Sequence, residues 1–317
     1  MKRVLLQTLK VIVSLGLLIF LFIRISPSRF IPHLRTMDPF HLAVALIAFF
    51  SSSFLGSIQW HMLLKADGIV LPFAKTFRLY FVGLFFNNFM LGNVGGDAVK
   101  IYDVTRVGND PYQVFAVTLL DRVIGITGLC ILALIASLIL LAGGGVENLK
   151  FYIIIFIGCV APGFALVLNK RLSGGVRNLF GMIGIWKLGE RFDTIFGHLG
   201  GFRKLRVLLM KLTFLALSVQ FLRVAVHIIV GRALGIELTP EILLYFYVFI
   251  PLLGLVVALP ISVGGLGIRE WIAVLLFAQI GFMDERTVLM ELLTWAVMVL
   301  VSLTGWVFFL QRHLRRG

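Results

Sequence analysis

The stretch PISVGGLGIREWIAVLLF, residues 260–277, raises the question on which the fold depends. A glycine-rich break interrupts an apolar run, and two adjacent charges, Arg269 and Glu270, follow it at once. Glycine permits the positive backbone dihedrals and the close approach that a sharp turn needs. A charge at the centre of a membrane helix costs about 2.5–3.5 kcal/mol on insertion scales. In an apolar chain the pair therefore lies at the water boundary or has a function inside the membrane.

The composition is that of an integral membrane protein. Hydrophobic residues make up 60% of the 317 residues, and the mean hydropathy is +1.02, well above a soluble domain. Two apolar stretches, 76–92 and 242–259, run into glycine and are expected to be the first limbs of re-entrant helical hairpins. Six windows have the length and apolarity of full spans: 4–23, 41–63, 114–141, 151–168, 211–231 and 287–310. We therefore predict one all-α polytopic membrane domain over residues 1–317.

The positive charge is placed as a membrane protein places it. The net charge is +14, and nine Lys and Arg residues lie between 169 and 211, with others at both ends of the sequence. The positive-inside rule assigns such segments to the cytoplasm. We expect both termini and a basic loop, 169–210, on the cytoplasmic side of the cell (inner or plasma) membrane, beside anionic lipid and not nucleic acid. The side of residues 24–40 is left open.

Signatures of soluble-type catalysis are missing from the sequence. It contains no Walker loop, HExxH or GxSxG motif, and GGLG at 264–267 does not fit GxGxxG. The six histidines show no metal-ligand spacing, and Cys130 and Cys159 lie inside predicted spans. We expect that the protein binds no cofactor or metal and is not an enzyme.

An internal repeat is visible when the chain is compared with itself. KADGIVLP (65–72) matches RALGIELTP (232–240), LYF (79–81) recurs at 244–246, and NVGGDAVK (93–100) matches SVGGLGIR (262–269). Three matches in one order at offsets of 165 to 169 predict two copies, 41–141 and 211–310. With the basic segments inside, the two copies begin on opposite faces of the membrane. Inverted repeats with broken helices that meet near the midplane recur in secondary transporters.

Each copy carries a cation and an acid after its Val-Gly-Gly turn. Lys100 and Asp103 follow the first turn, and Arg269 and Glu270 follow the second. A helix that begins there directs N–H groups towards an anion. The alternatives are that the glycines only permit close packing, that the cations extend to the interface, or that Asp97 and Asp103 neutralise Lys100 locally. The predicted substrate-binding residues are Lys100, Arg269, Gly95, Gly96, Gly264, Gly265 and Gly267.

Other polar residues stand within the predicted spans. Asp121–Arg122 interrupts an apolar run and is either placed for function or interfacial, and Glu291 stands at a similar distance from its own turn. Gln220, Arg223 and His227 form one stripe, which faces substrate or another helix. Asn87–Asn88 is expected to tie down the broken backbone. The charged or polar intramembrane candidates are Asp97, Asp121, Arg122, Glu270, Glu291, Gln220, Arg223 and His227.

At these residues the chain resembles the lysylphosphatidylglycerol synthase transmembrane family. The resemblance rests on VGLFFNNFMLGNVGGDAVKIYDVTR (82–106), TLLDRVIG (118–125) and LPISVGGLGIREWIAVLLF (259–277), and extends over roughly residues 5–310. This is the flippase-like membrane half of multiple peptide resistance factors, which also occurs alone. Members with a known role move lipids or lipid-linked headgroups between leaflets, and others are associated with glycolipid or hopanoid pathways. The resemblance points to Gly95, Gly96, Asp97, Lys100, Asp121, Arg122, Gly264, Gly265, Gly267, Arg269 and Glu270. Bifunctional relatives continue into an aminoacyl-transfer domain, whereas this sequence ends at Gly317, so lysyl transfer is not predicted.

Three functional interpretations follow. The first is a translocase for an anionic or polyprenyl-linked lipid, with the headgroup held by Lys100 and Arg269. The second is a non-transporting partner of a separately encoded lipid-modifying enzyme or glycosyltransferase, docked through the basic loop. The third is an intramembrane transferase, which needs an acid or base such as Asp97 or Asp121. The sequence does not define the lipid, the direction of movement, the energy coupling or the oligomeric state.

Overall fold

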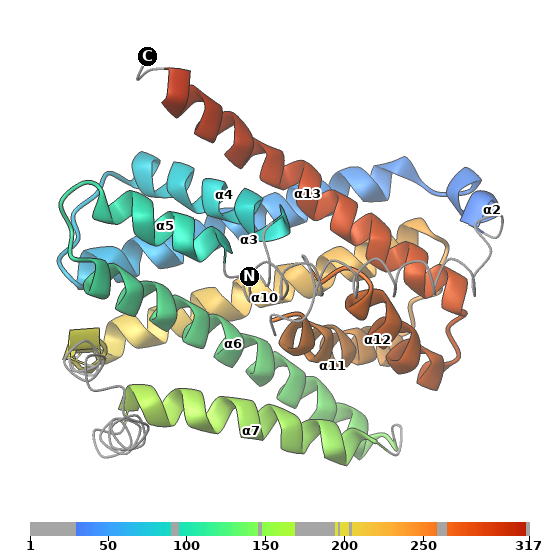
Figure 1. Cartoon of the computed structure of the whole chain (residues 1–317). Coiled ribbons are helices and arrows are strands. Elements are labelled where there is room, and N and C mark those ends of the chain that lie inside the picture. Colours follow the sequence, from blue (N-terminus) through green and yellow to red (C-terminus); the bar gives the residue numbers. More distant parts are fainter. Residues whose placement is uncertain are drawn as a thin grey trace, which may run out of the picture.

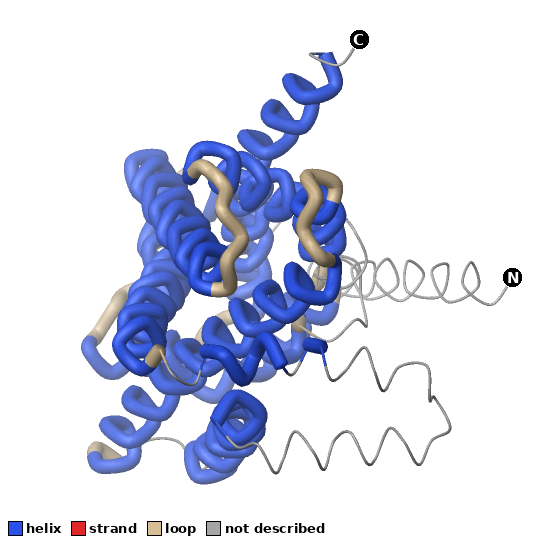
Figure 2. The backbone as a smooth tube through the Cα atoms, turned by 90° about the vertical axis from the view of Figure 1, so that its left-hand side faces the viewer, coloured by secondary structure: helices blue, strands red, loops and turns tan. Residues whose placement is uncertain are grey.

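A computed structural model describes residues 30–89, 95–144, 148–168, 194–195, 197–202, 205–258 and 265–314, and their regular structure is helical throughout (Figures 1 and 2). The first half contains α2 (Phe30–Arg35), α3 (Pro39–Ala66), α4 (Phe73–Phe89), α5 (Gly95–Thr105), α6 (Pro111–Ala142) and α7 (Leu149–Leu168). The second contains α10 (Arg206–Ala233), α11 (Pro240–Val257), α12 (Ile268–Phe277), a 3-10 helix η2 (Ala278–Ile280) and α13 (Asp284–Leu314). The predicted all-α class is confirmed.

Five of the described helices, α3, α6, α10, α11 and α13, are long and apolar enough to cross a membrane. Four of them fall on predicted spans, and α7 covers the window predicted at 151–168. The window 4–23 lies outside the described residues. The sequence predicted α11 to be only a hairpin limb, yet its 18 residues give about 27 Å, close to the apolar thickness of a bilayer. The chain is a multi-pass membrane protein.

Local sequence signals set where three of the long helices begin. Asp38, Asp110 and Thr239 are the N-caps of α3, α6 and α11, and each side chain accepts a hydrogen bond from a backbone N–H in the first turn. A proline stands at the start of all three helices. Proline suits this position because its fixed φ is helical and the missing N–H would have no partner within the helix.

The helices of the two predicted repeats correspond in length. They pair as α3 and α10 with 28 residues each, α4 and α11 with 17 and 18, α5 and α12 with 11 and 10, and α6 and α13 with 32 and 31. The turns after α3 and α10 both use a left-handed glycine, Gly68 at φ 85° and Gly235 at φ 72°.

The contacts between helices show the same correspondence between the two predicted repeats. Helix α3 packs on α10, α4 packs on α13, and α11 packs on α6. Likewise α5 contacts α4 and α6, while α12 contacts α11 and α13. Figure 1 shows the α4–α5 and α11–α12 pairs on opposite sides of the bundle. An internal repeat would produce this packing, while the opposite orientation of the two copies in the membrane stays a prediction.

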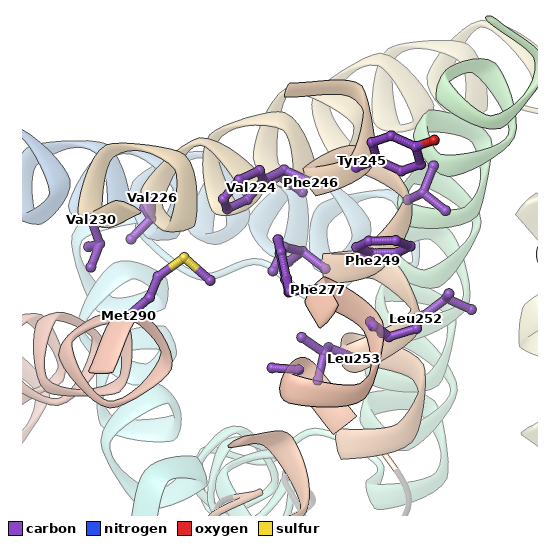
Figure 3. Packing of buried hydrophobic residues seen from close by; sticks show 14 of the residues in the cluster. Val224, Val226, Val230, Tyr245, Phe246, Phe249, Leu252, Leu253, Phe277 and Met290 are labelled. Carbon is purple, nitrogen blue, oxygen red and sulfur yellow. The ribbon is translucent and has the colours of Figure 1, made fainter. Parts of the chain in front are cut away.

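The largest apolar cluster joins α10, α11, α12 and α13, with further residues from α3, α4, α6 and α7. Figure 3 shows part of it, including Val224, Phe246, Phe249, Phe277 and Met290. The backbones of α13 and α4 also touch. A Cβ on Gly305 of α13 would lie 1.9 Å from the carbonyl oxygen of Phe81 in α4. Small residues that let backbones approach are typical of helix contacts in membranes. Large apolar side chains such as Ile47 and Phe214 remain exposed, as expected of a surface that faces lipid.

Candidate functional site

A cavity of about 370 Å³ lies among α3, α4, α5, α6, α10, α11, α12 and α13. All four helices of each predicted repeat contribute to its lining. Eight of the polar candidates predicted from the sequence line it: Asp97, Lys100, Asp121, Arg122, Gln220, Arg223, His227 and Arg269. The fold therefore brings both turn-following cations, Lys100 and Arg269, to one chamber.

Close contact between α4 and α5 places Lys100 in this chamber. A Cβ on Gly96 would lie 1.9 Å from the carbonyl oxygen of Gly83, so the two backbones touch here. The side chain of Asn87 accepts a hydrogen bond from the Gly96 N–H at 2.8 Å, which confirms the tying role predicted for this asparagine. One turn later, Lys100 lies on the same side of α5 as Gly96.

Lys100 is buried and has partners within the protein. Its side-chain nitrogen lies 2.8 Å from Oδ1 of Asp97, and 5.0 and 5.3 Å from the ring centres of Trp60 and Tyr80. Cations are attracted to aromatic faces at such distances. Asp97 also contacts Arg122, so one carboxylate neutralises parts of two cations. The local Asp97–Lys100 ion pair weighed from the sequence is confirmed.

Two further aspartates have partners on other helices. Asp103, the other acid expected near Lys100, instead lies 2.5 Å from Arg312 at the end of α13. Asp121 lines the cavity and accepts a hydrogen bond from Nε2 of Gln59 at 2.7 Å. Asp121 is therefore held by α3 at the cavity, while its depth in the membrane stays a prediction.

Arg269 and Glu270 form part of a buried charge network. Nη2 of Arg269 donates to Oε1 of Glu270 at 2.8 Å and to the backbone carbonyl of Glu291 at 3.2 Å. Oε2 of Glu291 lies 3.2 Å from Nε of Arg269 and 3.5 Å from Nε2 of His227. Glu270 and Glu291 are fully buried and in contact with Arg269. The adjacent charges of the opening stretch are thus placed inside the protein and not at the water boundary.

The start of α12 depends on glycine and on Glu270. Gly267 has φ 84°, a left-handed conformation that side chains disfavour. Oε2 of Glu270 accepts a hydrogen bond from the Gly267 N–H at 2.6 Å. The N–H groups of Gly96 and Gly267 are therefore bonded within the protein, although the sequence suggested that such groups face an anion. Gly95 and Gly265 are described but do not line the cavity, and Gly264 lies outside the described residues.

Burial also decides whether the two turn cations extend to the membrane surface. Lys100 and Arg269 are each 5% exposed. An interfacial lysine or arginine would keep its charged end in water, so that alternative is wrong for both.

The polar stripe of α10 faces the cavity. Gln220, Arg223 and His227 all line it, and Nε2 of Gln220 donates to the carbonyl oxygen of Gly125 at 3.0 Å. Gln220 thus has a packing role between α10 and α6. Arg223 is different, because within the described part of the chain its guanidinium has no carboxylate within ion-pair distance.

Sequence reasoning missed several residues of the site. Gln59 and Tyr80 line the cavity, and Trp60 lies over Lys100. Thr294 and Trp295 line it from α13. They follow Glu291 by three and four residues, a spacing that puts them on its side of the helix and could have identified them. In the segments that the structure describes, no three His, Cys, Asp or Glu residues are grouped to hold a metal ion.

This arrangement defines a class of protein, a polytopic helical membrane protein with a charged chamber at its centre. The family model for the lysylphosphatidylglycerol synthase TM region matches residues 7–305, and the chain belongs to that family. It is also 23% identical over 273 residues to a UPF0104 membrane protein of Methanothermobacter thermautotrophicus, a match that covers 78% of this chain and 76% of the relative. The family resemblance seen in the sequence is confirmed.

Proposed function

We propose that this protein is a lipid translocase, which moves an anionic or polyprenyl-linked lipid, or a lipid-linked headgroup, between the leaflets. The observation that carries the proposal is the charged cavity among the membrane helices. Its described lining contains four cations, Lys100, Arg122, Arg223 and Arg269, against two carboxylates, Asp97 and Asp121. Charges are rare and costly inside membrane segments and usually mark a substrate pathway.

The neutralising carboxylates suit a site that must release its ligand. Lys100 and Arg122 both pair with Asp97. Arg269 lies against Glu270 and Glu291. An uncompensated cluster of cations would bind an anionic headgroup tightly, whereas passage requires binding that is favourable for entry and weak enough for exit. A headgroup would compete with these carboxylates for the cations while its tails remain in the bilayer.

The correspondence of the two sets of helices supports a mechanism of alternating access. In inverted-repeat transporters, one repeat moves against the other around a central site. Here Lys100 comes from the first predicted repeat and Arg269 from the second, so relative movement would open the cavity to one leaflet and then the other. The proposal places both termini and the 169–210 segment on the cytoplasmic side.

Reconstitution tests the proposed activity directly. The purified chain would be placed in liposomes that contain a fluorescent phospholipid in both leaflets, and dithionite would be added outside. A translocase brings inner-leaflet label to the reagent, so the signal falls further than in protein-free liposomes. Loss of only the outer-leaflet signal with phosphatidylglycerol, other anionic phospholipids and polyprenyl phosphates would reject the proposal.

A further inference from the structure

The cations of the cavity differ in how far the protein already satisfies them. Asp97 lies against Lys100 and Arg122, and two glutamates lie against Arg269. Arg223 is the lining cation without an ion pair to any described residue, and its Nε, like that of Arg269, is buried without a hydrogen-bond acceptor there. An arginine Nε–H is only a donor, and a buried donor without an acceptor is costly. A ligand that supplies an acceptor would remove that cost.

Two residues of α13 that line the same cavity carry further donors without a partner in the described structure. Thr294 and Trp295 both line the cavity. Oγ1 of Thr294 and Nε1 of Trp295 are buried and have no hydrogen-bond partner in the described structure. Thr294 is only 1% exposed. The indole N–H is a donor only, while a hydroxyl can donate or accept.

Thr294 differs from the other hydroxyl residues of its helix. Ser302 and Thr304 donate to the carbonyls of Val299 and Val301 in α13, both at 2.8 Å, and Thr287 donates at 3.2 Å to the carbonyl of Met283, just before the helix. Such local bonding is the usual way for a hydroxyl in a helix to be satisfied. The Thr294 hydroxyl makes no such bond, so a ligand that reached it would supply its missing partner.

We infer that Arg223, Thr294 and Trp295 form a phosphate-binding subsite in the cavity, and that the ligand is a lipid with a phosphate group in its headgroup. This inference rests on the proposed function and names its substrate class. Arginine binds phosphate through parallel N–H bonds, and a phosphate has enough acceptor oxygens to take the hydroxyl and indole donors as well. Asn88 and Gln59 also have buried amide atoms without partners in the described structure, and an amide can serve the rest of a headgroup as donor or acceptor.

The subsite gives Lys100 and Arg269 a different role from Arg223. Each of the two is held by a carboxylate, for which a headgroup has to compete, whereas Arg223 has no such described partner and makes the first contact with the anion. Recognition would centre on α10 and α13, which pack against each other.

Binding in detergent micelles tests the subsite without transport. Calorimetric titration of the full chain would use dioctanoyl-phosphatidylglycerol, with dioctanoylglycerol as the match without phosphate and inorganic phosphate as the match without lipid. We expect the phospholipid to bind and dioctanoylglycerol to bind at least tenfold more weakly. Equal binding of the two lipids would overturn the inference. Binding of inorganic phosphate as tight as that of the phospholipid would retain the phosphate subsite and reject its assignment to a lipid.

Variants locate the binding. Arg223→Gln should raise the Kd for dioctanoyl-phosphatidylglycerol by about tenfold or more, because it removes a charge-assisted contact. Arg223→Lys keeps the charge without the Nε donor and should bind with intermediate affinity. The matched control Arg232→Gln removes an exposed charge from the same helix and should bind like the wild type. Wild-type affinity in Arg223→Gln would overturn the inference.

The α13 donors have matched controls on the same helix. Thr294→Val and Trp295→Phe should each raise the Kd about two- to tenfold, the range for a neutral hydrogen bond. Thr287→Val and Trp306→Phe change residues outside the cavity lining and should leave the Kd unchanged.

Failure of the proposed function can be told apart from failure of the subsite. A wild type that binds the phospholipid but does not exchange it between leaflets keeps the subsite and rejects the translocase. Exchange that continues at the wild-type rate, with unchanged affinity in Arg223→Gln, rejects the subsite alone.

Discussion

Replacing Gly96 by alanine tests the close contact on which the position of Lys100 depends. The added Cβ would lie 1.9 Å from the carbonyl oxygen of Gly83 and 2.7 Å from the side chain of Asn87, where ordinary contact begins near 3.4 Å. Helix α5 would have to move away from α4 by about 1.5 Å, the difference between 3.4 and 1.9 Å. The movement would break the Asn87–Gly96 hydrogen bond and draw Lys100 away from Trp60 and Tyr80.

The expected cost follows from these contacts. Overpacking of this kind costs about 1–3 kcal/mol, and a lost hydrogen bond adds about 1 kcal/mol. The better helix propensity of alanine opposes this by up to about 1 kcal/mol. Gly96→Ala should therefore lower the free energy of unfolding by about 1–3 kcal/mol, measured by denaturant titration in mixed micelles.

Gly158→Ala is the matched control for this substitution. Gly158 lies inside helix α7, and a Cβ there would meet nothing within 4 Å. This variant should be as stable as the wild type or slightly more stable, because alanine favours the helix. Equal stability of Gly96→Ala and Gly158→Ala would show that α4 and α5 are not in backbone contact.

Two further predictions concern the same framework. Gly305→Ala would place a Cβ 1.9 Å from the carbonyl oxygen of Phe81, so it should lower the free energy of unfolding by about 1–3 kcal/mol; an unchanged denaturation midpoint would contradict the contact of α13 with α4. Glu291→Gln removes a buried carboxylate that faces Arg269 and should destabilise by about 3–5 kcal/mol, while Glu241→Gln, at an exposed position, should have little effect in the same titration. Similar losses in these two glutamate variants would argue against a buried network.

Sequence patterns were sufficient for the helices and for most of the charged residues. Long apolar windows identify spans because lipid demands about 20 apolar residues, and a charge such as Asp121 is conspicuous there because it is costly. The status of α11 was harder to predict. At 18 residues, it is compatible with a hairpin limb or with a complete span.

The pairing of charges could not be predicted in the same way. Asp97 and Asp103 both lie three residues from Lys100, but only Asp97 pairs with it, because Arg312 of α13 is close to Asp103. Which acid meets which cation depends on how distant helices pack. Thr294 has an ordinary sequence context, and only the arrangement of the helices shows that it lines a cavity and that its buried hydroxyl has no described partner. The Gly267–Glu270 contact was accessible from the sequence, since a glutamate three residues after a helix N-cap is a capping signal.

Lipid exchange in liposomes would show whether the cavity is a path for lipid headgroups. The wild type would be compared with Lys100→Gln/Arg269→Gln and with Lys150→Gln/Arg232→Gln, which removes two exposed charges. Circular dichroism and size-exclusion profiles matching those of the wild type would establish that each variant is folded. We expect the wild type and the surface variant to bring inner-leaflet phosphatidylglycerol to external dithionite, and the cavity variant to do so at least tenfold more slowly. Equal rates in a folded cavity variant, or no exchange by the wild type, would contradict this role of the cavity.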